Sequence, residues 1–256
     1  KGPMVAACDS KYLLALAGLL NCNVSNYLLK LLAPTMDYNQ GPVSKLPWPN
    51  EIDLRISDIN HSVSLLESKA QIDWDAYETS WDFTSLPLLQ KDYLQPTLKD
   101  TYQKLRTHWR ELAKEMQRLE EENNRIFIEA YGLQEELTPE VPISEITLTC
   151  NPHYRYGGDK SESELETLLL TDTIKELLSY AIGCMMGRYS LDNPGLIYAH
   201  SGNKDFDPAQ YRTFPADLDG IIPITDLDWF DDDAANLVVD FFNITWPKER
   251  LEENLK

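Results

Sequence analysis

The chain has 256 residues, 43% of them hydrophobic, which is enough to build a folded core in one large domain or two small ones. It carries 42 acidic and 23 basic residues, so its net charge of −19 argues against free-standing affinity for nucleic acid or anionic membranes. No stretch of ~18 uncharged apolar residues occurs, and the cysteines stand alone, which is typical of a cytoplasmic protein without a membrane span. The chain begins with Lys1-Gly2-Pro3 instead of a start methionine or signal peptide, so we expect a piece of a longer protein.

The first third of the chain predicts helices separated by one irregular segment. Apolar residues between 12 and 32 cover more than one helical face, and Pro34 is expected to end this buried helix. Residues 35–49 contain a Gly-Pro turn signal and favour an extended or hairpin segment, after which helical spacing resumes over 53–69. Three aromatic residues then recur at helical spacing, which favours a packed core face over a base-stacking platform: Trp74, Tyr77 and Trp81.

The central part of the chain predicts one long helix at residues 97–132. An apolar stripe in heptad-like steps of four and three runs through Leu98, Tyr102, Leu105, Trp109, Leu112, Met116, Leu119, Asn123, Ile126, Ala130 and Leu133. At ~1.5 Å per residue such a helix would be roughly 50 Å long. It could be one rod or two helices broken near Asn123, where polar residues interrupt the stripe.

The last third predicts short strands between amphipathic helices. Residues 146–149, 196–199 and 220–224 have the composition of short strands, whereas 164–186 favours a helix that Gly187 terminates. Three aspartates at 231–233 are expected to open a final helix through their attraction to its positive end, with a buried side made of Leu237, Val238, Phe241 and Phe242. The predicted fold is therefore mainly α with a few short strands (α+β), with a long central helix packed by amphipathic helices.

One short motif invites a catalytic interpretation. Asn151-Pro152-His153-Tyr154 follows the first predicted strand, where amino-methyltransferases place Asn-Pro-Pro-Tyr around a flipped base. Here the third residue is histidine, no glycine-rich cofactor loop follows an earlier strand, and the flanking segments are helical. The sequence favours an ordinary exit from a strand into a loop.

Two basic-aromatic pairs lie beside glycines, where a backbone could approach a phosphate. Arg155-Tyr156 precedes Gly157, and Arg188-Tyr189 follows Gly187, although the sequence favours a helix-capping arginine and a packed tyrosine for each pair. The acidic residues from 217 to 228 lack the register of a calcium loop and favour a turn before a capped helix. The scattered histidines predict no metal site, and no nucleophile elbow, phosphate loop or catalytic triad is present.

Collinear stretches over nearly the whole chain carry a family resemblance: Asp73-Trp74-Asp75, Glu78–Phe83, Pro87-Leu88-Leu89, Asn124–Ile128, Tyr131–Gln134, Leu137–Glu140, Tyr180–Met185, Gly187–Ser190, Gly195–Ala199, Asp219–Ile224 and Leu251–Leu255. In these stretches the chain resembles the C-terminal region of the large adenine-specific DNA methyltransferases of bacteriophage-exclusion (BREX) and phage-growth-limitation systems, the PglX family. The segment Thr35–Pro47 also resembles the end of a target-recognition region in related restriction-modification enzymes.

The resemblance implies that the parent protein transfers a methyl group from S-adenosylmethionine to adenine in a short DNA site and so marks host DNA. It also implies that this piece is not catalytic, because the family's cofactor glycines and Asn-Pro-Pro-Tyr lie upstream of the matched region. Residues 1–50 would close the target-recognition region, and 51–256 would form a helical C-terminal domain. The candidates for DNA contact are Gln40, Lys45, Arg155, Tyr156, Arg188 and Tyr189.

The expected partner is double-stranded DNA, met through the full-length protein. Two alternatives remain at this point. The chain could be a docking module for other phage-defence proteins or for a second copy of itself, or it could be a self-contained methyltransferase. No metal, and no cofactor within this piece, is expected.

Overall fold

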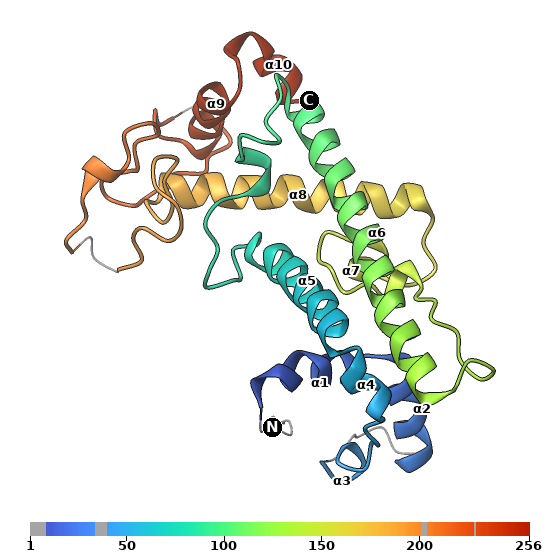
Figure 1. Cartoon of the computed structure of the whole chain (residues 1–256). Coiled ribbons are helices and arrows are strands. Elements are labelled where there is room, and N and C mark those ends of the chain that lie inside the picture. Colours follow the sequence, from blue (N-terminus) through green and yellow to red (C-terminus); the bar gives the residue numbers. More distant parts are fainter. Residues whose placement is uncertain (1–8, 34–39, 201–203, 228) are drawn as a thin grey trace. The chain divides into compact units, whose positions relative to one another are not determined.

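The computed structural model describes residues 9–33, 40–200, 204–227 and 229–256, and within them the regular elements are all helical (Figure 1). The α-helices are α1 (Leu13–Leu20), α2 (Asn23–Leu32), α3 (Gln40–Val43), α4 (Asn50–Leu54), α5 (Ile56–Asp75), α6 (Leu98–Tyr131), α7 (Pro152–Tyr156), α8 (Glu162–Met185), α9 (Ala234–Thr245) and α10 (Leu251–Asn254). Short 3-10 turns occur at Ser10–Tyr12, Pro87–Leu89, Ile143–Glu145, Pro208–Gln210 and Lys248–Arg250. The prediction of a mainly helical protein is confirmed.

The chain folds into two compact units. The first unit comprises residues 1–71 and 111–154, and the second comprises 72–110 and 155–256. The long helix α6 therefore contributes its N-terminal part to the second unit and its C-terminal part to the first. Each unit has its own buried core.

The single helix predicted for residues 12–32 is wrong, because the chain breaks between α1 and α2. The side-chain amide of Asn21 donates to the carbonyl of Ala17 at 2.9 Å, and Cys22 adopts an extended backbone as the N-cap of α2. No described helix is by itself long and apolar enough to cross a membrane. The segments Ser10–Leu20 and Asn23–Leu32 reach that length and hydropathy only as a pair, across a 72° bend.

The segment predicted to be extended contains the short helix α3. Pro42 is tolerated there because the backbone N–H groups of a first helical turn have no partner within the helix. Residues 35–39, and the predicted stop at Pro34, lie outside the described residues. The next predicted helix is confirmed over 56–69, and it continues to Asp75.

The aromatic core face predicted at the end of this helix is wrong. Helix α5 stops before two of its three members, and Trp74 and Trp81 are 58% and 100% exposed. Tyr77 is half-buried. Spacing alone suggested a buried face, but within the described part of the chain no apolar layer covers the two tryptophans.

Helix α6 is continuous, which decides between the two predicted forms (Figure 1). Asn123 does not break it, because its side chain is turned to a neighbouring helix: Nδ2 donates to the carbonyl of Gly18 at 3.0 Å. The helix ends as predicted at Gly132, which adopts φ 67°. The N–H of Leu133 then donates to the carbonyl of Ile128 at 3.0 Å, a Schellman closure that glycine permits.

The core of the first unit brings together apolar side chains from α1, α2, α4, α5 and the C-terminal part of α6. Its buried members are Ala15, Leu19, Cys22, Val24, Ile52, Ile59, Val63, Ile126, Phe127 and Ile128. Each large side chain among them contributes ~1.5–3 kcal/mol through removal from water, which offsets the entropy lost on ordering the chain. The predicted stripe of α6 supplies only part of this core, since Phe127 and Ile128 lie off the stripe.

The three predicted strands are wrong for the residues that the structure describes, because none of these segments finds a partner strand. Ile146 and Leu148 are buried, but the N–H of Leu148 donates back to the carbonyl of Ile146 at 2.8 Å in a tight turn. Residues 196–199 and 220–224 are irregular as well. β-Branched composition marks a segment that fits a half-buried surface and does not supply the neighbour that a ladder requires.

The second unit is built on α8, which begins at a capping box. The Ser161 hydroxyl accepts from the N–H of Glu164 at 3.3 Å, and the Glu164 carboxylate accepts from the N–H of Ser161 at 2.8 Å. Near its C-terminus an aromatic cluster packs together, with the rings of Tyr180 and Tyr189 stacked at 5.0 Å and Phe83 edge-on to both. The helix ends, as predicted, before Gly187.

The predicted last helix is confirmed as α9, with a correction to the role of its aspartates. Asp233 is the N-cap and accepts from the N–H of Ala235 at 2.9 Å, whereas the other two aspartates precede the helix. Phe241 and Phe242 are buried, and Leu237 and Val238 are half-buried. Asp233 also accepts from Thr225, so it ties the preceding loop to the start of α9.

Candidate functional site

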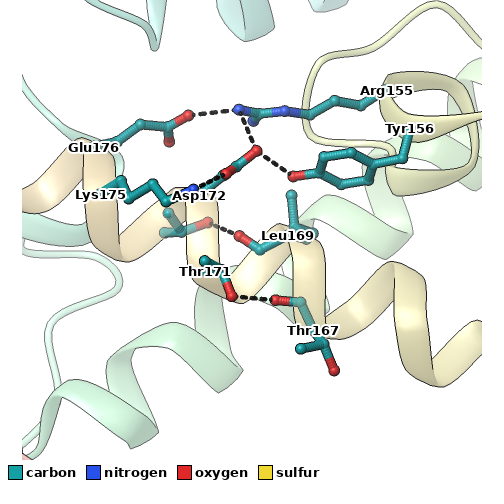
Figure 2. Close-up of polar contacts among 9 residues, drawn as sticks. Arg155, Tyr156, Thr167, Leu169, Thr171, Asp172, Lys175 and Glu176 are labelled. Atoms are coloured by element: carbon teal, nitrogen blue, oxygen red, sulfur yellow. Dashed lines mark hydrogen bonds and ion pairs between the residues drawn. The ribbon is translucent and has the colours of Figure 1, made fainter.

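Arg155 and Tyr156, two of the predicted DNA contacts, lie in an ion-pair network on α8 (Figure 2). The guanidinium NH2 of Arg155 lies 2.9 Å from Oε1 of Glu176 and 3.4 Å from Oδ2 of Asp172. The hydroxyl of Tyr156 donates to the same Asp172 oxygen at 2.8 Å. Arg155 also lies over the ring of Tyr77, 5.7 Å from its centroid.

The two carboxylates of this network are shifted in opposite directions. Burial raises the pKa of Glu176 and outweighs the hydrogen bond from Arg155. Burial also opposes ionisation of Asp172, but hydrogen bonds from Tyr156 and Lys175 together with nearby positive charge hold its pKa below the usual range. Arg155 keeps a raised pKa, despite burial, through Glu176. The network therefore holds an ionised arginine against α8, and its side chain is only 22% exposed.

Arg188 and Tyr189 occupy the C-terminal closure of α8, and their environments differ. The N–H of Arg188 donates to the carbonyl of Gly183 at 2.7 Å, which Gly187 permits by adopting φ 71°. The Arg188 guanidinium is exposed and lies 5.5 Å from the centroid of the Tyr189 ring. Tyr189 itself is 3% exposed. Arg188 is thus a surface cation whose guanidinium lies over the buried ring of Tyr189.

The remaining candidates belong to the first unit. Gln40 begins α3, Lys45 follows it, and both side chains are exposed. The structure thus brings Arg155 and Tyr156 into one network and Arg188 and Tyr189 into one helix terminus. It places Gln40 and Lys45 in a separate unit from these four.

Asn151 uses its side chain to hold its own segment together. Its Nδ2 donates to the carbonyls of Ile143 and Ile146 at 2.7 and 2.9 Å, and its Oδ1 accepts from the N–H of His153 at 3.2 Å. The residue is 2% exposed. An amino-methyltransferase asparagine needs its oxygen for the exocyclic amine of the flipped base, and here that oxygen serves α7.

The aspartates near residue 217 form turns, as the sequence favoured. Oδ1 of Asp217 accepts from the N–H groups of Asp219 and Gly220 at 2.9 and 2.8 Å, a pattern typical of Asx turns. Among the described residues no group of three or more histidine, cysteine or acidic side chains is arranged to hold a metal ion.

The locally basic stretch of α6 is partly neutralised by acidic side chains. Arg106 is buried and forms a bidentate ion pair with the Glu166 carboxylate, at 3.0 Å through Nε and 2.7 Å through NH2. Arg110 lies 3.1 Å from the same carboxylate, and Arg118 pairs with Glu115 at 2.9 Å. These arginines are paired with carboxylates, so they present less free positive charge than their number suggests.

Sequence reasoning missed the acidic partners of Arg155. Asp172 and Glu176 are four residues apart in the predicted helix, a spacing that puts both carboxylates on one face and could have indicated a basic partner. It also missed Glu120, a half-buried acid inside the first unit. The predicted stripe passes beside this residue without including it.

The whole chain is homologous to adenine-specific methyltransferases, which defines the class of protein to which it is related. It is 35% identical over 266 aligned positions to the adenine-specific methyltransferase BrxX of Escherichia coli O9:H4 (strain HS), covering all of this chain and 21% of that protein. It is 36% identical over 261 positions to the adenine-specific methyltransferase PglX of Lacticaseibacillus casei (strain Zhang), covering all of this chain and 20% of the relative. No protein-family model matches the chain.

These findings bear out the resemblance drawn from the sequence: the chain is a homologue of the BrxX and PglX methyltransferases over its full length. It spans about one fifth of the length of these relatives.

Proposed function

We propose that this chain is the non-catalytic C-terminal part of an adenine-specific DNA methyltransferase of a phage-defence system, and that it supports recognition of the DNA target. The observation that carries the proposal is the match of the entire chain to about one fifth of two adenine-specific methyltransferases. The parent enzyme would use S-adenosylmethionine and double-stranded DNA in the cytoplasm. Residues 1–50 would end the target-recognition region, and 51–256 would form the domain that supports it.

The engagement of Asn151 favours a non-catalytic role for this part. Its amide nitrogen donates to Ile143 and Ile146, its oxygen accepts from His153, and the residue is 2% exposed, so the side chain is held inside its own segment and not presented to a flipped adenine. A calorimetric titration of the 256-residue chain with S-adenosylmethionine should be flat. Saturable binding at one site, or methyl transfer by this chain alone, would contradict the proposal.

Among the candidates for DNA contact, Arg188 is the residue best placed to meet a phosphate. Its guanidinium is exposed on the buried ring of Tyr189, whereas Arg155 is held by two carboxylates. In the full-length enzyme, Arg188→Ala should weaken binding to all DNA sequences alike. It should also reduce the slope of log affinity against log salt by about one phosphate contact.

The matched control is Arg250→Ala, which removes another exposed arginine of the second unit, one that pairs with Glu253 at 3.0 Å. DNA affinity and adenine methylation should be measured for both variants in the same buffers. If Arg188→Ala leaves the affinity, its salt dependence and methylation equal to those of the control, this chain does not contact DNA through Arg188.

A second candidate function is docking of another protein, and exposed apolar side chains favour it. Six of them are 49–83% exposed in one irregular segment of the second unit: Leu218, Ile221, Ile224, Leu227, Trp229 and Phe230. Acidic residues interrupt them. A docking role predicts a concentration-dependent mass in light scattering, or co-purification with a defence component, that Trp229→Ser and Ile224→Ser abolish together. A monomer that retains no partner would contradict this function.

A further inference from the structure

The first unit contains a cavity of about 590 Å³. It is bounded by α1, α2, α5, the C-terminal part of α6 and the segment 141–147. Apolar side chains such as Leu13, Leu66 and Met116 form part of its wall. Its volume is within the range of sites that hold small organic molecules or a single large side chain.

The charges in the wall have one sign. Glu67 of α5, Glu120 of α6 and Glu145 line the cavity, and no lysine, arginine or histidine is among its described lining residues. Helices α1 and α2 contribute only uncharged groups, including the amides of Asn21 and Asn23. The field inside the cavity therefore favours a cation.

Glu120 responds to this arrangement. Burial, followed by repulsion from Glu145, raises its pKa to about 7. The carboxylate thus lies in a site where water does not fully solvate it and where the described wall supplies no positive charge. A bound cation would replace the missing solvation and stabilise the ionised form.

An unused hydrogen-bond acceptor lies in the same wall. Asn123 is 4% exposed, and while its Nδ2 donates to Gly18, its Oδ1 has no hydrogen-bond partner in the described structure. Both amide atoms of the adjacent Asn124, by contrast, have partners: its Oδ1 accepts from the N–H of Asn23 at 2.9 Å, and its Nδ2 donates to the carbonyl of Pro139 at 3.1 Å. A buried acceptor without a donor is uncommon and points to a group that the chain itself does not supply.

We propose that this cavity binds an organic cation, an ammonium or guanidinium group on an apolar stem, through Glu120 and the carbonyl oxygen of Asn123. The stem packs against the apolar wall, and the N–H groups donate to the two oxygens. The cation is either a free amine or a lysine or arginine side chain presented by another polypeptide segment. The proposal is independent of the role assigned to the whole chain.

The test compares a cation with a neutral molecule of similar shape. The 256-residue chain is titrated calorimetrically with phenethylammonium and with 2-phenylethanol, and in a further arm with the capped peptide acetyl-Leu-Lys-Leu-amide. Near pH 8 we expect phenethylammonium to bind about tenfold or more tightly than the alcohol, because only the cation pairs with the carboxylate. Below about pH 6 this preference should shrink as Glu120 takes up a proton. The tighter of amine and peptide identifies the source of the cation.

Glu120→Gln should remove the preference for the cation and leave weak binding of the alcohol, whereas Glu111→Gln, on an exposed part of the same helix, should change neither. A second measurement needs no variant, so it does not depend on whether Glu120→Gln folds. Near pH 7, binding of the amine should release protons, detected as a dependence of the heat on the ionisation enthalpy of the buffer. Absence of cation binding, equal affinity for the alcohol, or a preference that survives Glu120→Gln would each overturn the proposal.

Discussion

Replacement of Gly183 by alanine sets two effects of similar size against each other. Gly183 is in the last turn of α8, where alanine is favoured over glycine by up to about 1 kcal/mol through helix propensity. A Cβ at this position, however, would lie 2.6 and 2.9 Å from ring carbons of Tyr189. Contacts this short force Tyr189 to move, so the outcome depends on what its displacement costs.

The surroundings of Tyr189 indicate that displacing its ring costs considerable free energy. The ring is 3% exposed, stacked on Tyr180 at 5.0 Å and edge-on to Phe83 at 5.4 Å. Overpacking of a closed core costs about 1–3 kcal/mol, and each aromatic pair is worth about 0.5–1.5 kcal/mol beyond its buried area. Packing therefore outweighs propensity, and Gly183→Ala should lower the free energy of unfolding by about 1–3 kcal/mol.

Urea unfolding, followed by near-ultraviolet circular dichroism, measures the effect. Gly41→Ala is the matched control, because a Cβ on this helical glycine meets no atom within 4 Å, so its effect should be neutral or stabilising by up to about 1 kcal/mol. In a Tyr189→Ala background, Gly183→Ala should become stabilising by up to about 1 kcal/mol, since only propensity remains. If Gly183→Ala stabilises the otherwise unaltered chain as Gly41→Ala does, the packing argument is wrong.

Three further predictions concern stability and are checked by the same unfolding measurements. Ser161→Ala should lower the free energy of unfolding by about 0.5–2 kcal/mol because it removes the capping box of α8. Replacement of the exposed Ser163 by alanine should change it by no more than about 0.5 kcal/mol, and equal effects of the two substitutions would refute the role of the cap. Arg155→Ala should lower the free energy of unfolding by about 1–3 kcal/mol because it leaves Glu176 unpaired, whereas Arg188→Ala should change it little. A larger loss for Arg188→Ala than for Arg155→Ala would contradict the role of the ion-pair network. Because the pKa of Glu120 is raised from 4.5 to about 7, the folded state binds the proton more tightly, so stability relative to Glu120→Gln should fall as pH rises through this window. Glu120→Gln should be the more stable protein near pH 8 by about 1–2 kcal/mol, allowing for partial solvent exposure, and a difference that does not vary with pH would refute the shift.

The helices with strong periodicity and clear ends could be predicted from the sequence. The bounds of α6 and α8 differ from expectation by one or two residues, because apolar spacing and glycine stops are local properties of the chain. The predicted strands and the predicted aromatic face failed for a common reason. Residues 146–149 have strand composition and Trp81 has helical spacing, but a strand needs a neighbouring strand and a buried face needs a layer above it.

The candidate site shows the same division. The sequence alone determined that basic-aromatic pairs flank Gly157 and Gly187, and that a glycine after α8 would end the helix. Only the tertiary structure decided that Arg155 is held by Asp172 and Glu176 while Arg188 remains at the surface, because charge pairing depends on which faces of distant segments meet. For the same reason, the raised pKa of Glu120 could not be predicted from its neighbours in the chain: it arises from burial and from Glu145, twenty-five residues away in the sequence.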